Sequence, residues 1–479
     1  MIVETTNDLT GVTAEDLGRV HVIGIGGVGM NGVARLLVTR GIPVSGSDVR
    51  EWPALDALRA LGATVHMGHR TENLDGVDTV VYSTAIKEDN LELAEARRRG
   101  LRVLHRSEAL VAAMNGRQVV AVAGTNGKTT TTSMITNVLQ HCGLDPSFVI
   151  GGEMAEAGGS AHHGSGAHFV VEADESDKTF LLYHPKVAIV TNIEADHLDT
   201  YGDLAGVEAA FAEFAGKLTE DGFLVLCADD PGTQRLAEYA RGRNQQVYTY
   251  GRTAEADLEL RSMRTSPSGT TYEAVLEGET IGYVQIVVPG AHIALNSGAA
   301  LLAAIKLGVD PACAVEALGS YRGVRRRFEL KGTVDGVRVY DDYAYHPTSM
   351  DLQLRTVREV AGTGRLIVVF QPYRLYRTIA FEAGLAAALD LADEVVVMEV
   401  FCPGEERQPG QGGAALARAL TLDPEHVVFE PSWSGVAPEV ARRARRGDLV
   451  ITMGAPPISM MGEEILSALA DERLAGQHA

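Results

Sequence analysis

The chain has 479 residues, of which 46% are hydrophobic and 22% are charged, as expected for an ordinary globular protein of about three domains. Its formal net charge of -21 argues against broad nucleic-acid binding but leaves local nucleotide sites open. No stretch approaches the ~18 apolar residues of a membrane span. The polar segment 1–13 has no signal-peptide features, so we expect a cytoplasmic protein without membrane contact.

The cysteines predict a protein without disulfides. Cys142, Cys227, Cys313 and Cys402 lie far apart and form no C-x-x-C pattern. Such spacing favours free thiols in a reducing compartment over a disulfide framework or a zinc site.

The first motif is a strand that leads into G-x-G-x-x-G, at residues 20–30. A helix is predicted over 31–40, and a strand over 43–48 ends in Asp48, near the ~20-residue offset at which a carboxylate contacts ribose. Taken alone, this pattern indicates an NAD-dependent oxidoreductase. No hydride-transfer site follows, however, and a stronger phosphate loop comes later, at Lys128. We therefore interpret the first loop as a site for the diphosphate of a different nucleotide.

Alternation of strands and helices continues after this motif and predicts a small parallel α/β unit. Strands are expected at 64–67, 79–83 and 101–104, and helices at 54–61 and 90–99. Residues 115–117 form a turn-rich boundary. The predicted first domain is therefore 1–115.

The second motif is a strand at 118–122, a glycine loop and a helix, with Gly-Lys-Thr at the junction. Backbone N–H groups of such a loop and the helix dipole favour a phosphate. Lys128 is expected on the outer phosphates of a nucleotide, and the Thr129 hydroxyl on Mg²⁺. The loop is shorter than the standard one, because its first glycine is Gly124. The alternative is a Gly/Thr-rich turn before a helix.

Two later strands end in carboxylates or histidine. One ends at Glu172, and the other leads through 188–193 to His197. Because ligands bind outside the carboxyl ends of parallel strands, we expect Lys128, Glu172 and His197 to face one crevice. Glu172 suits Mg²⁺, whereas histidine is a less usual ligand for so hard an ion. A solvated acidic loop is the favoured interpretation of 174–177, and a surface histidine remains the alternative for His197.

The central domain is predicted to continue to residue 322. Further strands of its sheet are expected at 222–227 and 246–250, and a hairpin over 258–277. The basic run at 323–329 is either a solvated loop or an arginine held against nucleotide phosphates at a domain hinge.

The last region, 323–479, alternates again and is predicted to be a third α/β domain. Its strands are expected at 337–341, 366–370, 394–399, 427–430 and 449–453. The loops 342–347 and 371–377 each follow one of these strands, where binding loops belong.

The order of these motifs resembles the Mur ligase family, the ATP-dependent amide-forming enzymes of peptidoglycan precursor synthesis. The resemblance covers nearly the whole chain and is specific. It is carried by 24–30, 47–48, 68–69, 83–86, 124–132, 172–177, 191–203, 326–329, 341–343 and 371–378.

The resemblance implies three domains: an N-terminal Rossmann-like domain for a UDP-sugar, a central P-loop ATPase-like domain and a C-terminal Rossmann-like domain for the acceptor. It implies that ATP and Mg²⁺ activate the carboxylate of UDP-N-acetylmuramate, or a related UDP-sugar acid, as an acyl phosphate. An amino acid, expected to be L-alanine, then attacks to form the amide. Monomer and homodimer both remain open.

The family's site residues carry over onto matching positions of this chain. Lys128, Glu172 and His197 are implied to be catalytic, and Thr129, Glu172 and His197 to hold the metal. The implied UDP-sugar residues are Gly24, Gly26, Gly27, Gly29, Asp48, His69 and Ser83. The implied ATP residues are Gly124, Thr125, Asn126, Gly127, Lys128, Thr129, Thr130, Asn296, Arg327 and Asp342. The implied acceptor residues are Tyr343, Tyr345, His346, Arg374 and Arg377.

Several positions depart from the family pattern. Ile293 replaces a nucleobase-binding asparagine, Tyr345 and Tyr373 stand where histidines are usual, and Pro456-Pro457 replaces a Gly-Asp pair. These changes lie around the adenine and acceptor pockets. Three alternatives therefore stay open: a ligase of this type with another amine or acid, a non-catalytic nucleotide-binding protein, and the oxidoreductase.

Overall fold

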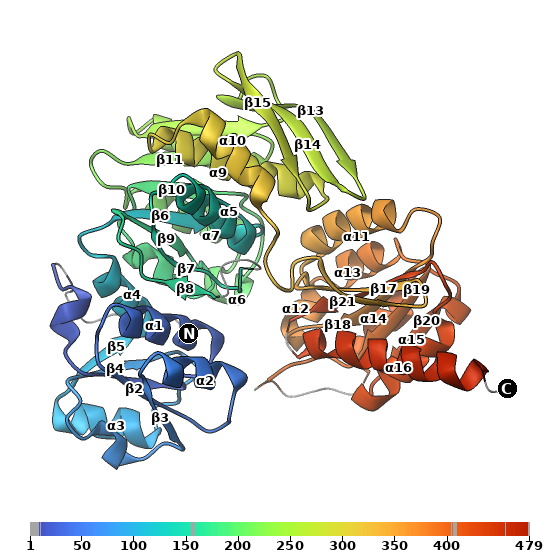
Figure 1. Cartoon of the computed structure of the whole chain (residues 1–479), viewed down its shortest axis with the longest axis horizontal. Helices are drawn as coiled ribbons and strands as arrows, with labels where there is room; N and C mark the ends of the chain where they lie inside the picture. Colours follow the sequence, from blue (N-terminus) through green and yellow to red (C-terminus); the bar gives the residue numbers. More distant parts are fainter. Residues whose placement is uncertain are drawn as a thin grey trace. The chain divides into compact units, whose positions relative to one another are not determined.

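The computed structural model describes residues 9, 11–154, 159–403, 405, 410–455 and 457–477 (Figure 1). Pro456, which departs from the family pattern, lies outside the described residues. The chain divides into two compact units. The first contains residues 1–262, 272–284 and 295–321, and the second contains 263–271, 285–294 and 322–479. Each unit is built from sheets covered by helices, so the predicted α/β class is confirmed.

The N-terminal sheet is parallel and has the order β3-β2-β1-β4-β5. Its strands are β1 (Val20–Ile23), β2 (Val44–Asp48), β3 (Thr64–Met67), β4 (Thr79–Tyr82) and β5 (Arg102–His105). The helical segments are η1 (Ala14–Leu17), α1 (Val28–Thr39), α2 (Pro53–Ala60), η2 (Thr71–Leu74), α3 (Leu91–Arg99) and α4 (Arg106–Met114). Because β1 is central, the glycine loop after it opens where the strand order reverses, which is the ligand position of such sheets.

The central sheet has ten strands in the order β15-β14-β13-β12-β11-β10-β6-β9-β7-β8. The strands are β6 (Gln118–Ala123), β7 (Ser147–Val149), β8 (Ala161–His162), β9 (His168–Glu172), β10 (Val187–Val190), β11 (Phe223–Cys227), β12 (Gln246–Gly251), β13 (Leu258–Ser266), β14 (Gly269–Leu276) and β15 (Glu279–Ile286). The helical segments are α5 (Lys128–His141), η3 (Thr179–Leu182), α6 (Leu198–Tyr201), α7 (Leu204–Ala215), α8 (Pro231–Arg241), α9 (Ala291–Lys306) and α10 (Pro311–Ser320). Strands β10, β6 and β9 are neighbours and parallel, so their carboxyl ends share one edge.

The predicted hairpin over 258–277 is correct for β13 and β14, but the sequence prediction missed β15. The turn between β14 and β15 has Glu277 and Gly278 at φ 51° and 90°. Two successive positive φ angles are typical of the tight turns that join hairpin strands. The Glu-Gly pair was therefore the available signal for a third strand.

The C-terminal sheet has the order β16-β17-β21-β18-β19-β20, with β16 antiparallel to β17. Its strands are β16 (Glu329–Val334), β17 (Val337–Asp342), β18 (Leu366–Gln371), β19 (Glu394–Met398), β20 (Val427–Glu430) and β21 (Leu449–Gly454). The helical segments are α11 (Pro347–Ala361), α12 (Leu375–Ala380), α13 (Glu382–Leu389), α14 (Gly413–Ala419), η4 (Pro424–His426), α15 (Trp433–Arg443), η5 (Ile458–Met460) and α16 (Met461–Gln477). Separate hydrophobic clusters cover the two faces of this sheet.

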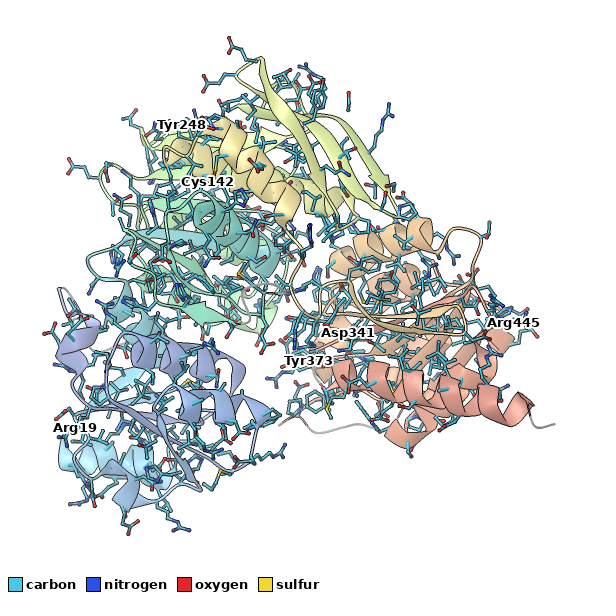
Figure 2. All side chains as sticks on the ribbon, viewed as in Figure 1. Arg19, Cys142, Tyr248, Asp341, Tyr373 and Arg445 are labelled. Carbon is cyan, nitrogen blue, oxygen red and sulfur yellow. A yellow bond between two sulfur atoms is a disulfide. The ribbon has the colours of Figure 1, made fainter. Side chains whose placement is uncertain are left out.

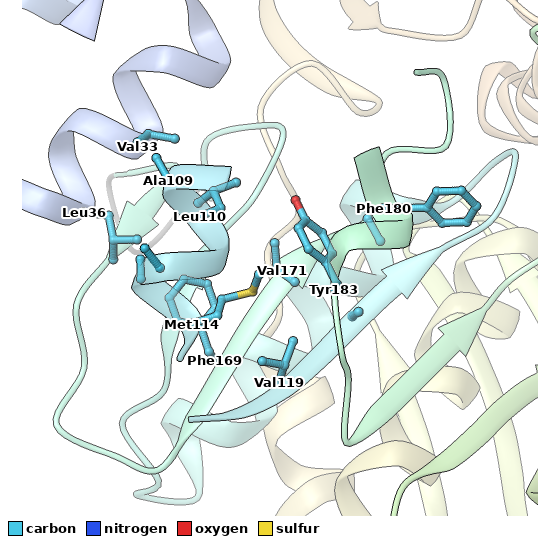
Figure 3. Close-up of a cluster of buried hydrophobic side chains, with 14 of the residues drawn as sticks. Val33, Leu36, Ala109, Leu110, Met114, Val119, Phe169, Val171, Phe180 and Tyr183 are labelled. Atoms are coloured by element: carbon cyan, nitrogen blue, oxygen red, sulfur yellow. The ribbon is translucent and has the colours of Figure 1, made fainter. Parts of the chain in front are cut away.

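One continuous hydrophobic core joins the N-terminal sheet to the central sheet. Leu36 of α1 and Met114 of α4 belong to the same buried cluster as Val119, Phe169 and Tyr183 of the central region (Figure 3). Helix α4 therefore binds the two sheets together through buried apolar side chains. No helix among the described residues is long and apolar enough to cross a membrane.

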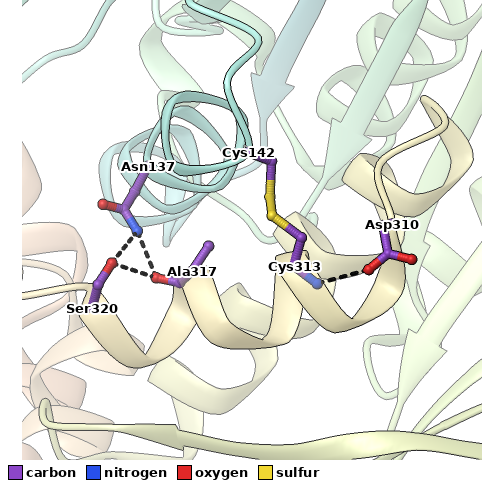
Figure 4. Close-up of a disulfide and its surroundings, with 6 residues drawn as sticks. All are labelled: Asn137, Cys142, Asp310, Cys313, Ala317 and Ser320. Atoms are coloured by element: carbon purple, nitrogen blue, oxygen red, sulfur yellow. Dashed lines mark hydrogen bonds between the residues drawn. A yellow bond between two sulfur atoms is a disulfide. The ribbon is translucent and has the colours of Figure 1, made fainter.

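The prediction of four free thiols is wrong for two of them. Cys142, at the end of α5, forms a disulfide with Cys313 of α10, with the two Cα atoms 6.1 Å apart (Figure 4). The two cysteines are separated by 171 residues, so no local spacing could reveal the pair. Asn137 also links these helices, because its side-chain amide donates to the carbonyl of Ala317 at 2.8 Å. The other two cysteines are free and buried.

Candidate active site

The phosphate loop connects β6 to α5, as the sequence predicts. Gly124 and Gly127 have φ of 127° and 85°, where side chains other than glycine are rarely found. A Cβ on Gly124 would lie 2.1 Å from the Thr191 hydroxyl oxygen, and one on Gly127 would lie 2.6 Å from Asn296 Oδ1. Both glycines are therefore required by backbone geometry and by close neighbours. The same contact places Asn296, an implied ATP residue, beside the loop.

The Lys128 ammonium group is held by a carboxylate and by the loop itself. Its Nζ donates to Glu175 Oε1 at 2.8 Å and to the carbonyl oxygens of Gly124 and Thr125 at 2.7 and 3.2 Å. Burial disfavours the charged amine, but Glu175 and Asp174 outweigh that effect and raise the pKa of Lys128. The lysine is therefore a fixed positive charge at the loop, suited to neutralising phosphate.

The interpretation of 174–177 as a solvated acidic loop is wrong for Glu175. Its side chain is 3% exposed, so it is not part of a solvated run. Burial raises the pKa of its carboxyl to about 7, although Lys128 opposes that shift. A buried acid requires a partner, and the partner lies 47 residues earlier in the chain. The local sequence at 172–177 therefore could not indicate that Glu175 pairs with Lys128.

Thr129, in the first turn of α5, lies beside Glu172 at the end of β9. The Thr129 hydroxyl donates to Glu172 Oε1 at 3.0 Å, and Glu172 Oε2 accepts the Gly151 N–H at 2.8 Å. Two oxygens of the predicted metal set thus face each other across the strand ends.

His197 follows β10 and has φ of 52°. Its Nε2 lies 3.9 Å from Glu175 Oε1 and 3.6 Å from Asp196 Oδ2. Glu175 thus lies between Lys128 and His197, since one of its oxygens is near both. Lys128, Glu172 and His197 all lie at or after the carboxyl ends of the neighbouring strands β6, β9 and β10, whereas the crevice that they are expected to face and their chemical roles stay predictions.

The residues at this edge fit Mg²⁺ bound together with a phosphate rather than in a protein cage. No group of three His, Cys, Asp or Glu side chains among the described residues could hold a metal ion. Mg²⁺ commonly takes one or two carboxylates and completes its shell with substrate phosphate and water. The adjacent oxygens of Thr129 and Glu172 suit such a shared site.

Further loop residues are fixed by polar partners that the sequence analysis did not single out. Asn192, after β10, accepts the Asn126 N–H at 2.9 Å and donates to the Asn126 carbonyl at 2.9 Å. Thr125 Oγ1 accepts the Glu194 N–H at 2.9 Å. These bonds connect the loop to the β10 end. Thr130, in the first turn of α5, is buried.

The first glycine loop is bound to the end of β2. The carbonyl of Ser47 accepts the N–H groups of Gly24 and Ile25 at 2.8 and 3.1 Å. Asp48 Oδ2 accepts the Gly26 N–H at 2.9 Å, and Oδ1 accepts the Trp52 indole N–H at 3.2 Å. Asp48 therefore supports the loop in addition to any contact with a ligand.

Other implied UDP-sugar residues lie around the same strand ends. A Cβ on Gly29 would lie 2.4 Å from an Arg106 guanidinium nitrogen, and one on Gly27 would lie 3.3 Å from a loop carbonyl. His69 follows β3, and its Nδ1 lies 2.8 Å from Ser47 Oγ. Ser83 follows β4, where its carbonyl accepts the Ile86 N–H.

In the C-terminal unit, the implied acceptor residues form an aromatic and arginine cluster. The centre of the Tyr345 ring lies 5.6 Å from the centres of the Tyr343 and Tyr373 rings. Tyr373 is labelled in Figure 2. The Arg377 guanidinium lies 4.8 Å from the centre of the Tyr345 ring. Arg374 lies 5.5 Å from the Tyr373 ring. Residues from two separate loops are thus brought together, because both loops follow parallel strands, β17 and β18, that flank β21 in one sheet.

The basic run at 323–329 joins this cluster and is not simply a solvated loop. The guanidinium groups of Arg326 and Arg327 lie 4.7 and 4.9 Å from the ring of Tyr343. Asp342 accepts the N–H groups of Phe328 and Ala344, both at 2.8 Å. Burial raises the pKa of Asp342 to about 6.

His346 is placed differently from the other acceptor residues. It is buried, and its ring lies 5.0 Å from that of Phe381. Ile293, which replaces a family asparagine, is also buried.

Sequence profiles of one family match three successive segments of the chain. They are described as the Mur ligase family, catalytic domain, over residues 19–118, the Mur ligase middle domain over 122–304, and the Mur ligase, glutamate ligase domain, over 326–456. The family predicted from the motifs is therefore confirmed.

Two curated relatives carry the same name, UDP-N-acetylmuramate–L-alanine ligase. The protein of Salinispora arenicola is 62% identical over 462 residues, which cover 96% of this chain and 90% of the relative. The protein of Acidothermus cellulolyticus is 51% identical over 456 residues, which cover 95% of this chain and 96% of the relative.

Solved structures agree with the sequence comparisons. The crystal structure of the UDP-N-acetylmuramate–alanine ligase MurC from Thermotoga maritima matches with a TM-score of 0.79 and 29% identity, covering 95% of this chain and 99% of that one. The murein peptide ligase of Psychrobacter arcticus matches with a TM-score of 0.71 and 25% identity, covering 95% of this chain and 99% of that one.

Proposed function

The chain belongs to the Mur ligase family, and on that premise we propose that it joins L-alanine to the carboxylate of UDP-N-acetylmuramate at the expense of ATP. The observation that carries the proposal is that Lys128 and Thr129, in the first turn of α5, bond to Glu175, just after β9, and to Glu172, at its end, in a chain similar throughout to ligases of that name. This reaction is a step of peptidoglycan precursor synthesis and thus serves cell-wall formation, cell shape and division.

The first step is attack of the substrate carboxylate on the γ-phosphate of ATP, which releases ADP and leaves an acyl phosphate. Phosphoryl transfer needs charge neutralisation and positioning more than covalent help from the protein. Lys128 leaves Glu175 to contact the outer phosphates, and the N–H groups of residues 127–130, at the start of α5, surround them. Bound Mg²⁺ supplies further neutralisation, and Thr129 and Glu172 would hold it with His197 nearby.

The second step is attack of the amino group on the acyl phosphate, which forms the amide, expels phosphate and releases a proton. Arg374 and Arg377 suit the carboxylate of the amino acid, because guanidinium can bind it with two hydrogen bonds. Tyr343, Tyr345 and His346 complete the proposed acceptor site.

The nucleotide sites are assigned by the same argument. Asn296 beside the loop, with Arg327 and Asp342, is proposed to bind ATP. The UDP-sugar is proposed to lie at the first glycine loop and at Asp48, His69 and Ser83, because close backbone approach suits a diphosphate. The proposed domain borders are 1–115, 116–322 and 323–479. The protein is proposed to act in the cytoplasm as a monomer or homodimer, without nucleic-acid or membrane partners.

A coupled assay tests the proposal. Purified protein is given ATP, Mg²⁺ and UDP-N-acetylmuramate with each amino acid in turn, and phosphate release and product mass are followed. We expect turnover with L-alanine. Turnover confined to another amino acid would favour a different acceptor. That alternative is tested because Tyr345 and Tyr373, which stand where histidines are usual in the family, lie side by side in the acceptor cluster. Binding of nucleotide without turnover with any acceptor would overturn the ligase proposal.

A further inference from the structure

Glu92 is a completely buried carboxylate in the N-terminal domain, and none of the proposed roles uses it. It is the second residue of α3, and its side chain has 0% exposure. A buried charge is costly unless it is paired or hydrogen-bonded. The partners of Glu92 therefore indicate what the position is for.

Both carboxylate oxygens of Glu92 accept hydrogen bonds from residues of the proposed UDP-sugar site and the loop beside it. Oε2 accepts from Ser47 Oγ at 2.5 Å and lies 3.1 Å from His69 Nδ1. Oε1 accepts from Asn73 Nδ2 at 2.6 Å and from the Arg70 N–H at 3.2 Å. Burial by itself raises the pKa of Glu92, but His21, Ser47 and Asn73 outweigh it and lower the pKa to about 2. Glu92 is thus ionised at neutral pH.

An ionised carboxylate accepts hydrogen bonds and donates none, and this determines the proton positions around it. Ser47 has one hydroxyl proton, which it donates to Glu92. The 2.8 Å contact between Ser47 Oγ and His69 Nδ1 therefore needs its proton on Nδ1. In the neutral imidazole of His69, Nε2 then carries the lone pair.

The same network reaches the first glycine loop. Ser47, which donates to Glu92, accepts the N–H groups of Gly24 and Ile25 through its carbonyl. On the other side, Asn73 donates to Glu92 and also to the Gly68 carbonyl at 3.1 Å. Glu92 thus links the glycine loop after β1 to the loop that carries His69.

We propose that Glu92 is a positioning residue for the UDP-sugar: it holds His69 with its Nδ1 proton directed inward, so that Nε2 accepts a hydrogen bond from a hydroxyl or N–H group of the ligand. This inference rests on the proposed function, which assigns His69 to that ligand. Glu92 itself does not contact the ligand, because its oxygens are buried behind Ser47 and His69.

The test compares Glu92→Gln with Glu95→Gln, a matched variant on the same helix whose carboxylate pairs with Arg98 and Arg99. We expect Glu92→Gln to raise the KM for UDP-N-acetylmuramate and its Kd without ATP by about 10- to 100-fold, the usual effect of losing hydrogen bonds to a charged group. The KM for ATP and kcat should change by less than about twofold. Glu95→Gln should change none of these values.

A second measurement reads the proton position in the wild-type protein and does not need Glu92→Gln to fold. Nitrogen NMR of the histidine rings in the wild-type protein, with the His69 signal assigned from its loss in His69→Gln, should report a neutral Nδ1–H tautomer. An Nε2–H tautomer in the wild type, or a folded Glu92→Gln that binds UDP-N-acetylmuramate as tightly as the wild type, would overturn the inference alone. A wild-type protein that binds no UDP-sugar would overturn the proposed function as well.

Discussion

The phosphate loop and the acceptor cluster are organised by different forces. Around Lys128, charged and backbone groups pair within hydrogen-bond distance, and two glycines allow the close approach. Around Tyr345, rings and guanidinium groups are 4.8 to 5.6 Å apart and pack by their faces and edges. The first arrangement depends on exact donors and acceptors, whereas the second depends on shape. We therefore expect substitutions to abolish function at the loop and to shift selectivity at the cluster.

The largest expected effect is that of Lys128→Ala. Loss of the Lys128 ammonium group, which the loop carbonyls hold, should lower kcat by about 1,000-fold or more, because the charge of the transferred phosphoryl group is less well neutralised. The affinity for UDP-N-acetylmuramate, measured by calorimetry, should remain mostly unchanged. Lys186→Ala, which removes a surface ion pair with Asp221, is the control. Equal loss of turnover and UDP-sugar binding would argue against separate sites.

Reduction of the Cys142–Cys313 disulfide tests how firmly the helix after the phosphate loop is anchored. Opening a loop of 171 residues should lower the free energy of unfolding by about 4 kcal/mol, near the upper end of the usual range. Denaturant unfolding with and without a thiol reductant measures the difference. Cys142→Ser should remove the response to reductant, whereas Cys227→Ser should keep it. A wild-type protein with four titratable thiols before reduction would contradict the pairing.

Acid should weaken the N-terminal domain through Glu92. Its pKa is about 2 in the folded protein against an ordinary value of 4.5, so its contribution to stability is complete above pH 4.5. That contribution, about 3 kcal/mol, is lost as the pH falls from 4.5 towards 2. Urea unfolding at several pH values should show this loss in the wild type and a smaller one in Glu92→Gln. Identical profiles would contradict the assignment.

The smallest effect is expected in the acceptor cluster. Arg377→Ala should raise the KM for the amino acid by about tenfold, since one charged hydrogen-bonding group is removed while the tyrosine rings of the cluster remain. The KM for ATP should not change. Arg355→Ala, which removes an exposed ion pair on α11, is the control. If the two variants behave alike, Arg377 serves packing and not the acceptor.

Prediction succeeded where a feature is encoded within a few residues. The glycine loops at Gly24 and Gly124 each lie between a strand and a helix, as their sequences indicate. Prediction failed for contacts between distant residues. Glu175 was interpreted as solvated, Cys142 and Cys313 as free thiols, and Glu92 was overlooked.

The sequence by itself determined the family, the α/β class and the residues that follow each strand, because strand period, glycine loops and Gly-Lys-Thr are local patterns. The tertiary structure alone decided which charges are buried and paired. Glu92 stands between two leucines and Glu175 lies in an acidic run, and their roles follow from partners 45 and 47 residues away. A buried carboxylate is stable only beside its donors, and the fold determines where those donors lie.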